Sequence, residues 1–198
     1  QSRAAFAATV DQQPDDALCI SIGGGPNHVH PKLVNLNISL FANVHVVGDA
    51  YRLPYADGSV DAVYCEAVLE HLELPNDAVR EMFRVLRPGG QVFAATPFMQ
   101  KFHAYPNHFQ NFTLIGHRRL FERAGFAIWS DGVCVGPTFA IFGLVARYML
   151  LYVPIAGLRQ LLAGLFAGLA LALRPFDLLT NRSHDAHMLA STTFVHAV

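Results

Sequence analysis

The sequence has little cysteine, almost no net charge and no signal-peptide pattern. Three cysteines are an odd number, so they give no disulfide framework, and free core thiols suit a reducing cytoplasm. A net charge of −1 argues against a polyelectrolyte partner, so we expect no nucleic acid. The first residues lack a secretory pattern and a starting Met, as in a shortened chain. We therefore expect a cytoplasmic protein.

Metal-ligand spacing is also missing, although the chain has 10 histidines. Neither Cys-x-x-Cys nor His-Glu-x-x-His occurs in the sequence. His103 and His108 stand near each other, but they flank prolines in a loop-like stretch. We therefore expect no metal site.

A glycine-rich turn, SIGGGP at residues 21–26, directly follows a short apolar segment. Glycines after a buried strand let a ligand approach the backbone closely. An acidic residue at the end of a later strand, Asp49, can accept hydrogen bonds from a base or an amine. The order of these features is that of a nucleotide-type cofactor site on a parallel sheet.

Strands alternate with helices along the chain, which predicts an α/β fold with a mostly parallel sheet. Asn76 and Thr113 are the expected N-caps of two helices, and Gly125 follows the end of the second. The last two strands would form an antiparallel pair within one domain, 1–198. We expect helices at residues 66–72, 77–86 and 114–124, and strands at 18–22, 33–38, 44–47, 62–65, 91–95, 127–135 and 189–198.

Two connections are too short for the helices that usually join parallel strands. The loops after residue 25 and after residue 38 fall short of the dozen or more residues that a crossover needs. We therefore expect two crossover helices to be reduced to loops. A parallel sheet without helices on one face would expose apolar side chains to water, so another segment must cover that face.

The most apolar segment, residues 138–182, stands before the last expected strand. Three arginines divide it, so it has no uninterrupted apolar run near the ~20 residues of a membrane-spanning helix, and none is expected. No Asp or Glu lies between Asp131 and Asp177. We interpret the segment as a helical insertion with two alternative roles. It either covers the core or forms a homodimer interface, or it docks on a membrane surface with its arginines at anionic headgroups.

Four stretches carry a family resemblance: SIGGGP at 21–26, GDAYRLPYADGSVDAVYCEAVLEHL at 48–72, RVLRPGG at 84–90 and YPNHFQNFTLIGHRRLFERAGF at 105–126. At these residues the chain resembles the class I S-adenosylmethionine-dependent methyltransferases, in particular the small-molecule branch typified by quinone-biosynthesis methyltransferases. The resemblance covers about residues 18–129 and not the insertion. It implies a Rossmann-like, seven-stranded sheet with an antiparallel last strand, and S-adenosylmethionine as the cofactor.

The resemblance also implies the cofactor contacts. Asp49 would accept a hydrogen bond from the adenine amino group. The other expected contacts are Gly23, Gly24 and Gly25 against the methionine portion, Ala50 and Leu53 beside the adenine ring, and Glu66 at the edge of the cleft.

Two positions depart from the family pattern. The family usually has an acid before the glycine turn and another at the end of the second strand, where this chain has Ser21 and Asn37. Asn37 is still expected to contact the ribose, but a neutral hydrogen bond contributes ~0.5–1.5 kcal/mol against ~1.5–3 kcal/mol for a charged one. Each change would weaken binding by about tenfold or less. The alternative is therefore a degenerate member that acts as a scaffold or a membrane-associated binding module.

The loop after the fifth expected strand lies where the family's acceptor site forms, and it contains His103 and His108. Imidazole titrates near neutral pH, so either histidine could serve as a general base. Because the sulfonium already activates the methyl group, the protein must mainly hold the acceptor in line with it. We predict a methyltransferase that acts on a small acceptor, apolar or lipid-linked, with oxygen as the expected methylated atom.

Overall fold

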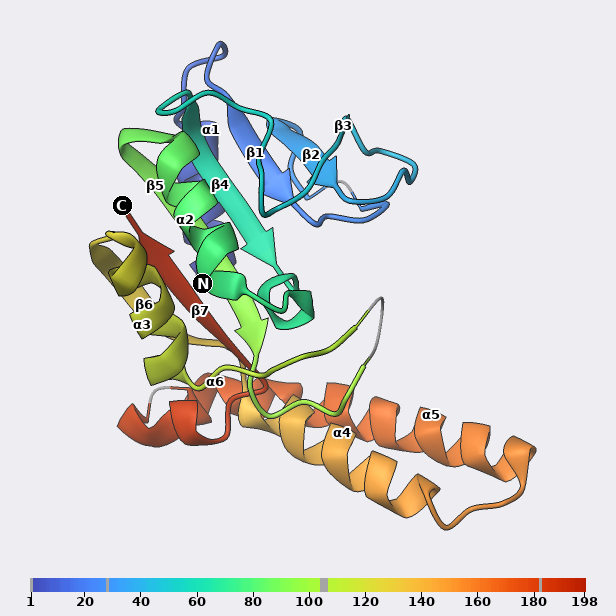
Figure 1. Cartoon of the computed structure of the whole chain (residues 1–198). Helices are drawn as coiled ribbons and strands as arrows, with labels where there is room; N and C mark the ends of the chain where they lie inside the picture. The colour runs from blue at the N-terminus through green and yellow to red at the C-terminus, as the bar shows by residue number, and fades with distance from the viewer. Residues whose placement is uncertain (1, 28, 104–106, 182) are drawn as a thin grey trace.

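The computed structural model describes residues 2–27, 29–103, 107–181 and 183–198, which contain one seven-stranded sheet with helices on both faces (Figure 1). The strand order is β3-β2-β1-β4-β5-β7-β6. The first five strands run parallel, and β7 runs antiparallel to β5 and β6. All seven expected strands and the antiparallel pair are confirmed. They are β1 (Cys19–Ile22), β2 (Leu33–Asn37), β3 (Val46–Val47), β4 (Val60–Glu66), β5 (Leu86–Pro97), β6 (Ile128–Val135) and β7 (Thr192–Ala197).

Two of the three expected helices form. α3 (Leu114–Ala124) has the expected ends, because the Thr113 hydroxyl accepts a backbone hydrogen bond at the N-terminus and Gly125 is left-handed, with a φ of +110°. α2 (Pro75–Val85) begins earlier than expected, so the prediction of Asn76 as its N-cap is wrong. A proline at the first helical position sacrifices no hydrogen bond there, which explains the earlier start.

The prediction of a third helix, at residues 66–72, is wrong. β4 continues through Glu66, whose backbone pairs with Ala95 of β5, and only a 3₁₀ turn follows, η1 (Leu69–His71). Ala67 lies between the two with a φ of +54°, a left-handed conformation that interrupts a helical path. The sheet pairing therefore overrides the local helical pattern.

The face of the sheet opposite α2 and α3 is covered by α1 (Ser2–Asp11), a helix that the sequence analysis did not predict (Figure 1). Phe6 and Val10 of α1 are buried, and the Phe6 ring packs on Tyr64 and Phe93 of the central strands. In the described residues, loops without helices join β1 to β2 and β2 to β3, as expected. α1 thus replaces part of the missing crossover layer.

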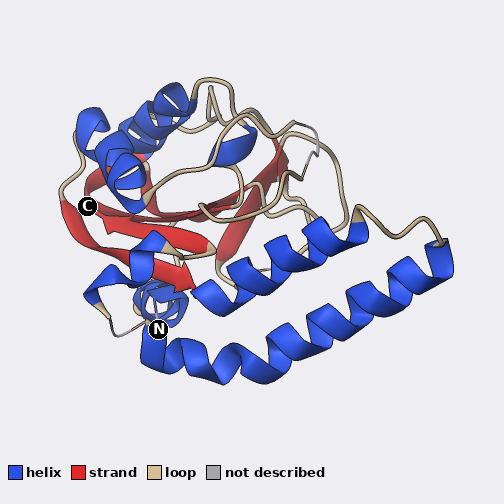
Figure 2. Cartoon of the chain, turned by 90° about the horizontal axis from the view of Figure 1, so that it is seen from below, coloured by secondary structure: helices blue, strands red, loops and turns tan. Residues whose placement is uncertain are grey.

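The insertion contains two long helices, α4 (Pro137–Leu150) and α5 (Ala156–Leu173), which lie side by side and project from the sheet near the carboxyl ends of β4 and β5 (Figures 1 and 2). Shorter helices follow: η2 (Arg174–Phe176), α6 (Asp177–Thr180) and η3 (His184–Met188). The expectation that the insertion covers the core is wrong, because the buried residues of α4 and α5 are only Pro137, Ala140 and Ala170.

One carboxylate holds the base of this helix pair. Asp177 is buried, and its Oδ1 accepts a hydrogen bond of 3.0 Å from the Thr138 backbone N–H. Beyond the base the helices are exposed. The run Ala156–Thr180 is long and apolar enough, by length and composition, to cross a membrane, and 6% of its most apolar window is buried.

Candidate functional site

The glycine turn follows β1 at the carboxyl edge of the sheet (Figure 1). Gly23 has a φ of +74° and Gly25 a φ of +56°, both in the left-handed region that favours glycine. A Cβ on Gly23 would lie 2.2 Å from Val68 Cγ2, whereas one on Gly25 would meet open space. Gly23 is therefore required for space and conformation, and Gly25 for conformation.

A cavity of about 510 Å³, here named the first cavity, opens beside this turn at the carboxyl ends of β1, β2 and β3. Five expected cofactor residues line it: Gly23, Gly25, Asn37, Asp49 and Ala50. Its apolar lining includes Ile22, Leu36, Ile38, Phe41, Val68 and Leu72. An apolar concavity with a few polar groups has the character of a small-molecule site.

The polar side chains of the first cavity are oriented by their own loops. Asp49 Oδ1 accepts a hydrogen bond of 2.9 Å from the Tyr51 backbone N–H. Asn37 Oδ1 accepts one of 3.3 Å from the Ser39 backbone N–H. Asp and Asn commonly form such turns two residues ahead, so the sequence itself positions both groups where β2 and β3 end.

Three expected cofactor residues do not line the first cavity. Gly24 lines a separate cavity with Ser21 and Asn27. Leu53 is buried in the core, because its backbone N–H donates to Glu81 and draws the loop against α2. Glu66 is also absent from the lining of the first cavity.

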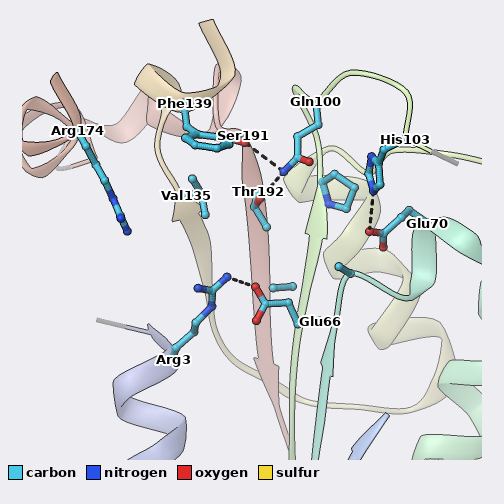
Figure 3. A pocket seen from close by; sticks show the side chains of 13 residues that line it. Arg3, Glu66, Glu70, Gln100, His103, Val135, Phe139, Arg174, Ser191 and Thr192 are labelled. Atoms are coloured by element: carbon cyan, nitrogen blue, oxygen red, sulfur yellow. Dashed lines mark hydrogen bonds and ion pairs between the residues drawn. The ribbon is translucent and has the colours of Figure 1, made fainter. Parts of the chain in front are cut away.

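The position of Glu66 follows from strand alternation. Residues two apart in a strand share a face, so Glu66 lies on the same side of the sheet as Tyr64, toward α1. Its carboxylate accepts hydrogen bonds from the Tyr64 hydroxyl and from the Arg3 guanidinium of α1. The Glu66 side chain therefore forms an ion pair with Arg3 of α1, a helix that was not predicted from the sequence (Figure 3).

A second cavity, of about 280 Å³, lies next to the first, and Ala67 lines both. Figure 3 shows its lining converging from the ends of β4, β5 and β7, from the loop after β5 and from the insertion. Gln100 donates hydrogen bonds to Ser191 Oγ (3.2 Å) and Thr192 Oγ1 (2.9 Å), which holds that loop against β7. The insertion contributes Phe139 and Arg174.

A buried carboxylate lies between the two cavities. Glu70, in η1, has no exposed surface, and neither of its carboxylate oxygens has a hydrogen-bond partner within the described part of the chain. Its Oε1 lies 3.8 Å from His71 Nε2 and 3.8 Å from His103 Nε2. Burial raises the pKa of Glu70 to about 7 and lowers the pKa of His71.

The two histidines predicted as alternative bases have different surroundings. His103 lines the second cavity and faces Glu70 (Figure 3). His108 is not among the lining residues. Its Nδ1 accepts from the His103 backbone N–H at 3.1 Å, and its Nε2 lies 2.6 Å from Asn111 Oδ1. The structure therefore brings His103, and not His108, to the cavity wall.

Sequence patterns did not predict Glu70, Phe139 or Arg174 as site residues. Glu70 stands in the motif EHL, but a glutamate in a short turn gives no signal of complete burial. Phe139 and Arg174 lie in the insertion, which the family resemblance does not cover. They meet Ser191 and Thr192 at the second cavity only in the folded chain.

The model of a methyltransferase domain family matches residues 28–94 of this chain. The match contains β2 to β4, η1, α2 and most of β5, with Asn37, Asp49 and the Glu70 turn. A methyltransferase of Thermotoga maritima, described as S-adenosylmethionine-dependent, shares the fold with a TM-score of 0.57 and 14% identity, over 99% of this chain and 88% of that one. Residues 28–94 thus resemble a methyltransferase domain, and the chain as a whole has the fold of a known S-adenosylmethionine-dependent methyltransferase.

Two curated relatives resemble shorter parts of this chain. An uncharacterized chloroplastic methyltransferase of Arabidopsis thaliana is 54% identical over 56 residues, which are 28% of this chain and 16% of that protein. A demethylmenaquinone methyltransferase of Beutenbergia cavernae is 44% identical over 71 residues, 34% of this chain and 30% of that protein. The chain thus aligns with less than a third of the length of either relative.

Proposed function

We propose that this protein is an S-adenosylmethionine-dependent methyltransferase that methylates an oxygen of a small acceptor, apolar or lipid-linked. The observation that carries the proposal is the junction of the two cavities at Ala67, on the carboxyl edge of the sheet. In methyl transfer the donor sulfur, the methyl carbon and the acceptor atom must lie in line, which two adjoining cavities allow. Such positioning can lower the activation barrier by ~7–11 kcal/mol.

The first cavity would hold the cofactor. Its methionine portion would lie against Gly23 and Gly25, where the backbone is open to close approach. The adenine amino group would donate to Asp49, and Asn37 would be a neutral partner of the ribose. Five of the eight expected cofactor residues line the first cavity and are proposed to contact the cofactor. The other three, Gly24, Leu53 and Glu66, do not line it.

The proposed step transfers a methyl group with its positive charge. The bond from the methyl carbon to the sulfonium sulfur breaks, and a bond from that carbon to the acceptor oxygen forms. The sulfur keeps the electron pair, so S-adenosylhomocysteine leaves as a neutral thioether. The hydroxyl proton passes to His103, the histidine on the wall of the second cavity.

The lining of the second cavity supports the acceptor class. Phe139 and Arg174 come from an apolar, exposed insertion, so an acceptor with an apolar tail could continue from the cavity along α4 and α5. A relative named for the quinone demethylmenaquinone points in the same direction.

The partner that we propose for α4 and α5 is the surface of an anionic membrane. Leu161 and Leu165 are more than half exposed, as are Tyr148 and Tyr152 near the turn between the helices. Apolar and aromatic side chains of this kind insert at the boundary of headgroups and acyl chains. The absence of Asp and Glu from α4 and α5, together with Arg147 and Arg159, suits anionic lipids. The protein would thus be cytoplasmic and peripheral to a membrane.

Calorimetric titration with S-adenosylhomocysteine tests the cofactor half of the proposal. We expect one site per chain with a dissociation constant in the micromolar range. No binding at high micromolar ligand would reject the proposed enzymatic function and favour the degenerate scaffold. The neutral residues Ser21 and Asn37, at positions where the family usually has acids, are the reason for considering that alternative.

Product analysis tests the acceptor half. Methyl-labelled S-adenosylmethionine is incubated with quinols and other hydroxyl compounds that carry tails of increasing length, and mass spectrometry locates the label. We expect the label on oxygen and faster turnover with longer tails. Label on carbon would reject O-methylation, and a preference for short polar acceptors would reject the apolar class.

A further inference from the structure

Three electron-pair donors converge between the two cavities. One ligand atom from each of Glu70, His71 and His103 lies within 4.8 Å of the other two, and Figure 3 shows Glu70 and His103 facing each other. His71 lines the first cavity, whereas Glu70 and His103 line the second. The cluster therefore stands where a donor in one cavity would meet an acceptor in the other.

The hydrogen bonds of both histidine rings leave Nε2 as the atom that faces the carboxylate. His71 Nδ1 is bonded to the backbone carbonyl of Asn107, and His103 Nδ1 lies 3.2 Å from that of Lys101. A carbonyl only accepts, so each Nδ1 carries the hydrogen, and in a neutral ring Nε2 then has a lone pair. When Glu70 is ionised, two lone pairs thus point at its carboxylate, and none of the three atoms has a hydrogen to donate.

The carboxylate gives the second, independent observation. Glu70 is completely buried, and both its oxygens lack a hydrogen-bond partner within the described residues. Burying a carboxylate without a partner is strongly unfavourable, and buried charges are normally paired or coordinate metals. We propose that Glu70, His71 and His103 form a binding site for a divalent transition-metal ion such as Zn²⁺.

The geometry suits three protein ligands and an open position. Zn²⁺ takes His nitrogen at ~2.0–2.1 Å and carboxylate oxygen at ~2.0–2.2 Å, which separates tetrahedral ligands by about 3.4 Å. The two separations of 3.8 Å from Glu70 Oε1 are close to this value, so small side-chain rotations bring the ligands into range. Two His and one Glu with a fourth position open is the ligand set of a catalytic zinc site.

The surrounding backbone holds the ligands in place. The loop that carries His103 is fixed to η1 by the His71–Asn107 bond, by the Phe109 backbone N–H donating to the Glu70 carbonyl (2.9 Å) and by Gln110 donating to the Leu72 carbonyl (2.9 Å). Hydrogen bonds from the second ring nitrogen to a carbonyl are the usual way in which metal-ligating histidines are oriented.

The role of the ion rests on the proposed function. An acceptor hydroxyl at the open position would bind through its oxygen, and the positive charge would lower the pKa of that hydroxyl. Because the ion would occupy the His103 lone pair, the proton would pass to water in place of His103. The oxygen would then take the methyl group from the sulfonium. Metal binding itself needs neither cofactor nor acceptor, so it can be measured alone.

Calorimetric titration of the whole protein with Zn²⁺ tests the site. We expect one ion per chain and an affinity loss in Glu70→Gln, His71→Ala and His103→Ala that exceeds the 10–100-fold typical of outer partners. The matched control is the double variant His184→Ala/His187→Ala, which removes a histidine pair with ring centroids 6.2 Å apart, one member exposed and the other partly buried. It should bind Zn²⁺ as the unchanged protein does.

Equal Zn²⁺ affinity in the unchanged protein, Glu70→Gln and His103→Ala would overturn the proposal, as would no binding at all. Circular dichroism verifies that each variant is folded. Because the His103 side chain is partly exposed in a loop, that variant gives the answer even where a change at buried Glu70 unfolds the protein. Separate titration with S-adenosylhomocysteine shows whether a failure concerns the metal or the methyltransferase function.

Discussion

Gly23 and Val68 lie so close that a methyl group on the glycine would stand 2.2 Å from Val68 Cγ2. The contact joins the turn after β1 to the segment after β4, and both residues line the first cavity. The shape of the proposed cofactor site thus depends on a glycine that packs against a residue far away in the sequence.

Gly23→Ala should therefore disturb the first cavity. The new methyl group meets Val68, and alanine at a φ of +74° adds a conformational cost of about 1–3 kcal/mol. We expect at least that loss of unfolding free energy in urea, together with weaker binding of S-adenosylhomocysteine. Retention of both properties would contradict the geometry of the turn.

Gly164→Ala in α5 is the matched control for this change. A Cβ at Gly164 has no neighbouring atom within 4 Å, and the residue lies in the interior of a helix. Alanine favours a helix over glycine by about 1 kcal/mol, so we expect equal or higher stability and unchanged S-adenosylhomocysteine binding.

Asp49→Asn tests the adenine contact. The change replaces a charged acceptor by a neutral one, so we expect about a tenfold weaker binding of S-adenosylhomocysteine in calorimetry. Asp16→Asn, at an exposed position near the N-terminus, controls for the loss of one negative charge. Equal affinity of Asp49→Asn and the control would remove Asp49 from the site.

His117 should make the protein less stable in acid. Its ring is fully buried between Thr96 and Thr193, and burial lowers its pKa to about 3. Since the unfolded chain takes up a proton near pH 6.5 and the native state does not, the stability present above pH 6.5 falls as the pH drops toward 3. The expected loss between pH 8 and pH 5 is about 2 kcal/mol.

Urea unfolding at several pH values measures this effect, with His117→Gln as the comparison because glutamine is polar and does not titrate. Burial also lowers the pKa of His196, which adds a loss of the same sign in both proteins. The difference between the two curves therefore isolates His117. Parallel curves from pH 8 to pH 5 would show that this side chain is not buried in the neutral form.

The exposed helices should bind anionic vesicles. Leu161→Asp/Leu165→Asp places two charges on α5, and we expect the loss of more than tenfold in co-sedimentation with phosphatidylserine vesicles, since each buried Leu contributes about 1.5–3 kcal/mol. Added salt should weaken binding of the unchanged protein. Ile115→Asp, at an exposed position of α3, should bind normally.

Sedimentation equilibrium separates the membrane from the homodimer. A monomer that binds vesicles supports the proposed surface. A stable dimer that the two Asp substitutions dissociate, and that does not bind vesicles, would assign the same faces to a second copy of this chain.

Local pattern was sufficient for much of the fold. Apolar runs bounded by turns located all seven strands, and the cap residues Thr113 and Gly125 located both ends of α3. The same pattern failed at residues 66–72, where pairing of Glu66 with β5 outweighs helical periodicity. It also failed for α1, because an N-terminal helix is stabilised here by the strands on which Phe6 and Val10 pack.

Local sequence was enough to locate the strands, the glycine turn and the Asp49 loop, since each of these depends on residues that are close together in the chain. Tertiary structure alone decided which side chains meet. In the folded chain Glu66 pairs with Arg3, Leu53 lies in the core and His103 faces Glu70. These residues meet because strand ends and loops that are far apart in sequence converge at one edge of a parallel sheet.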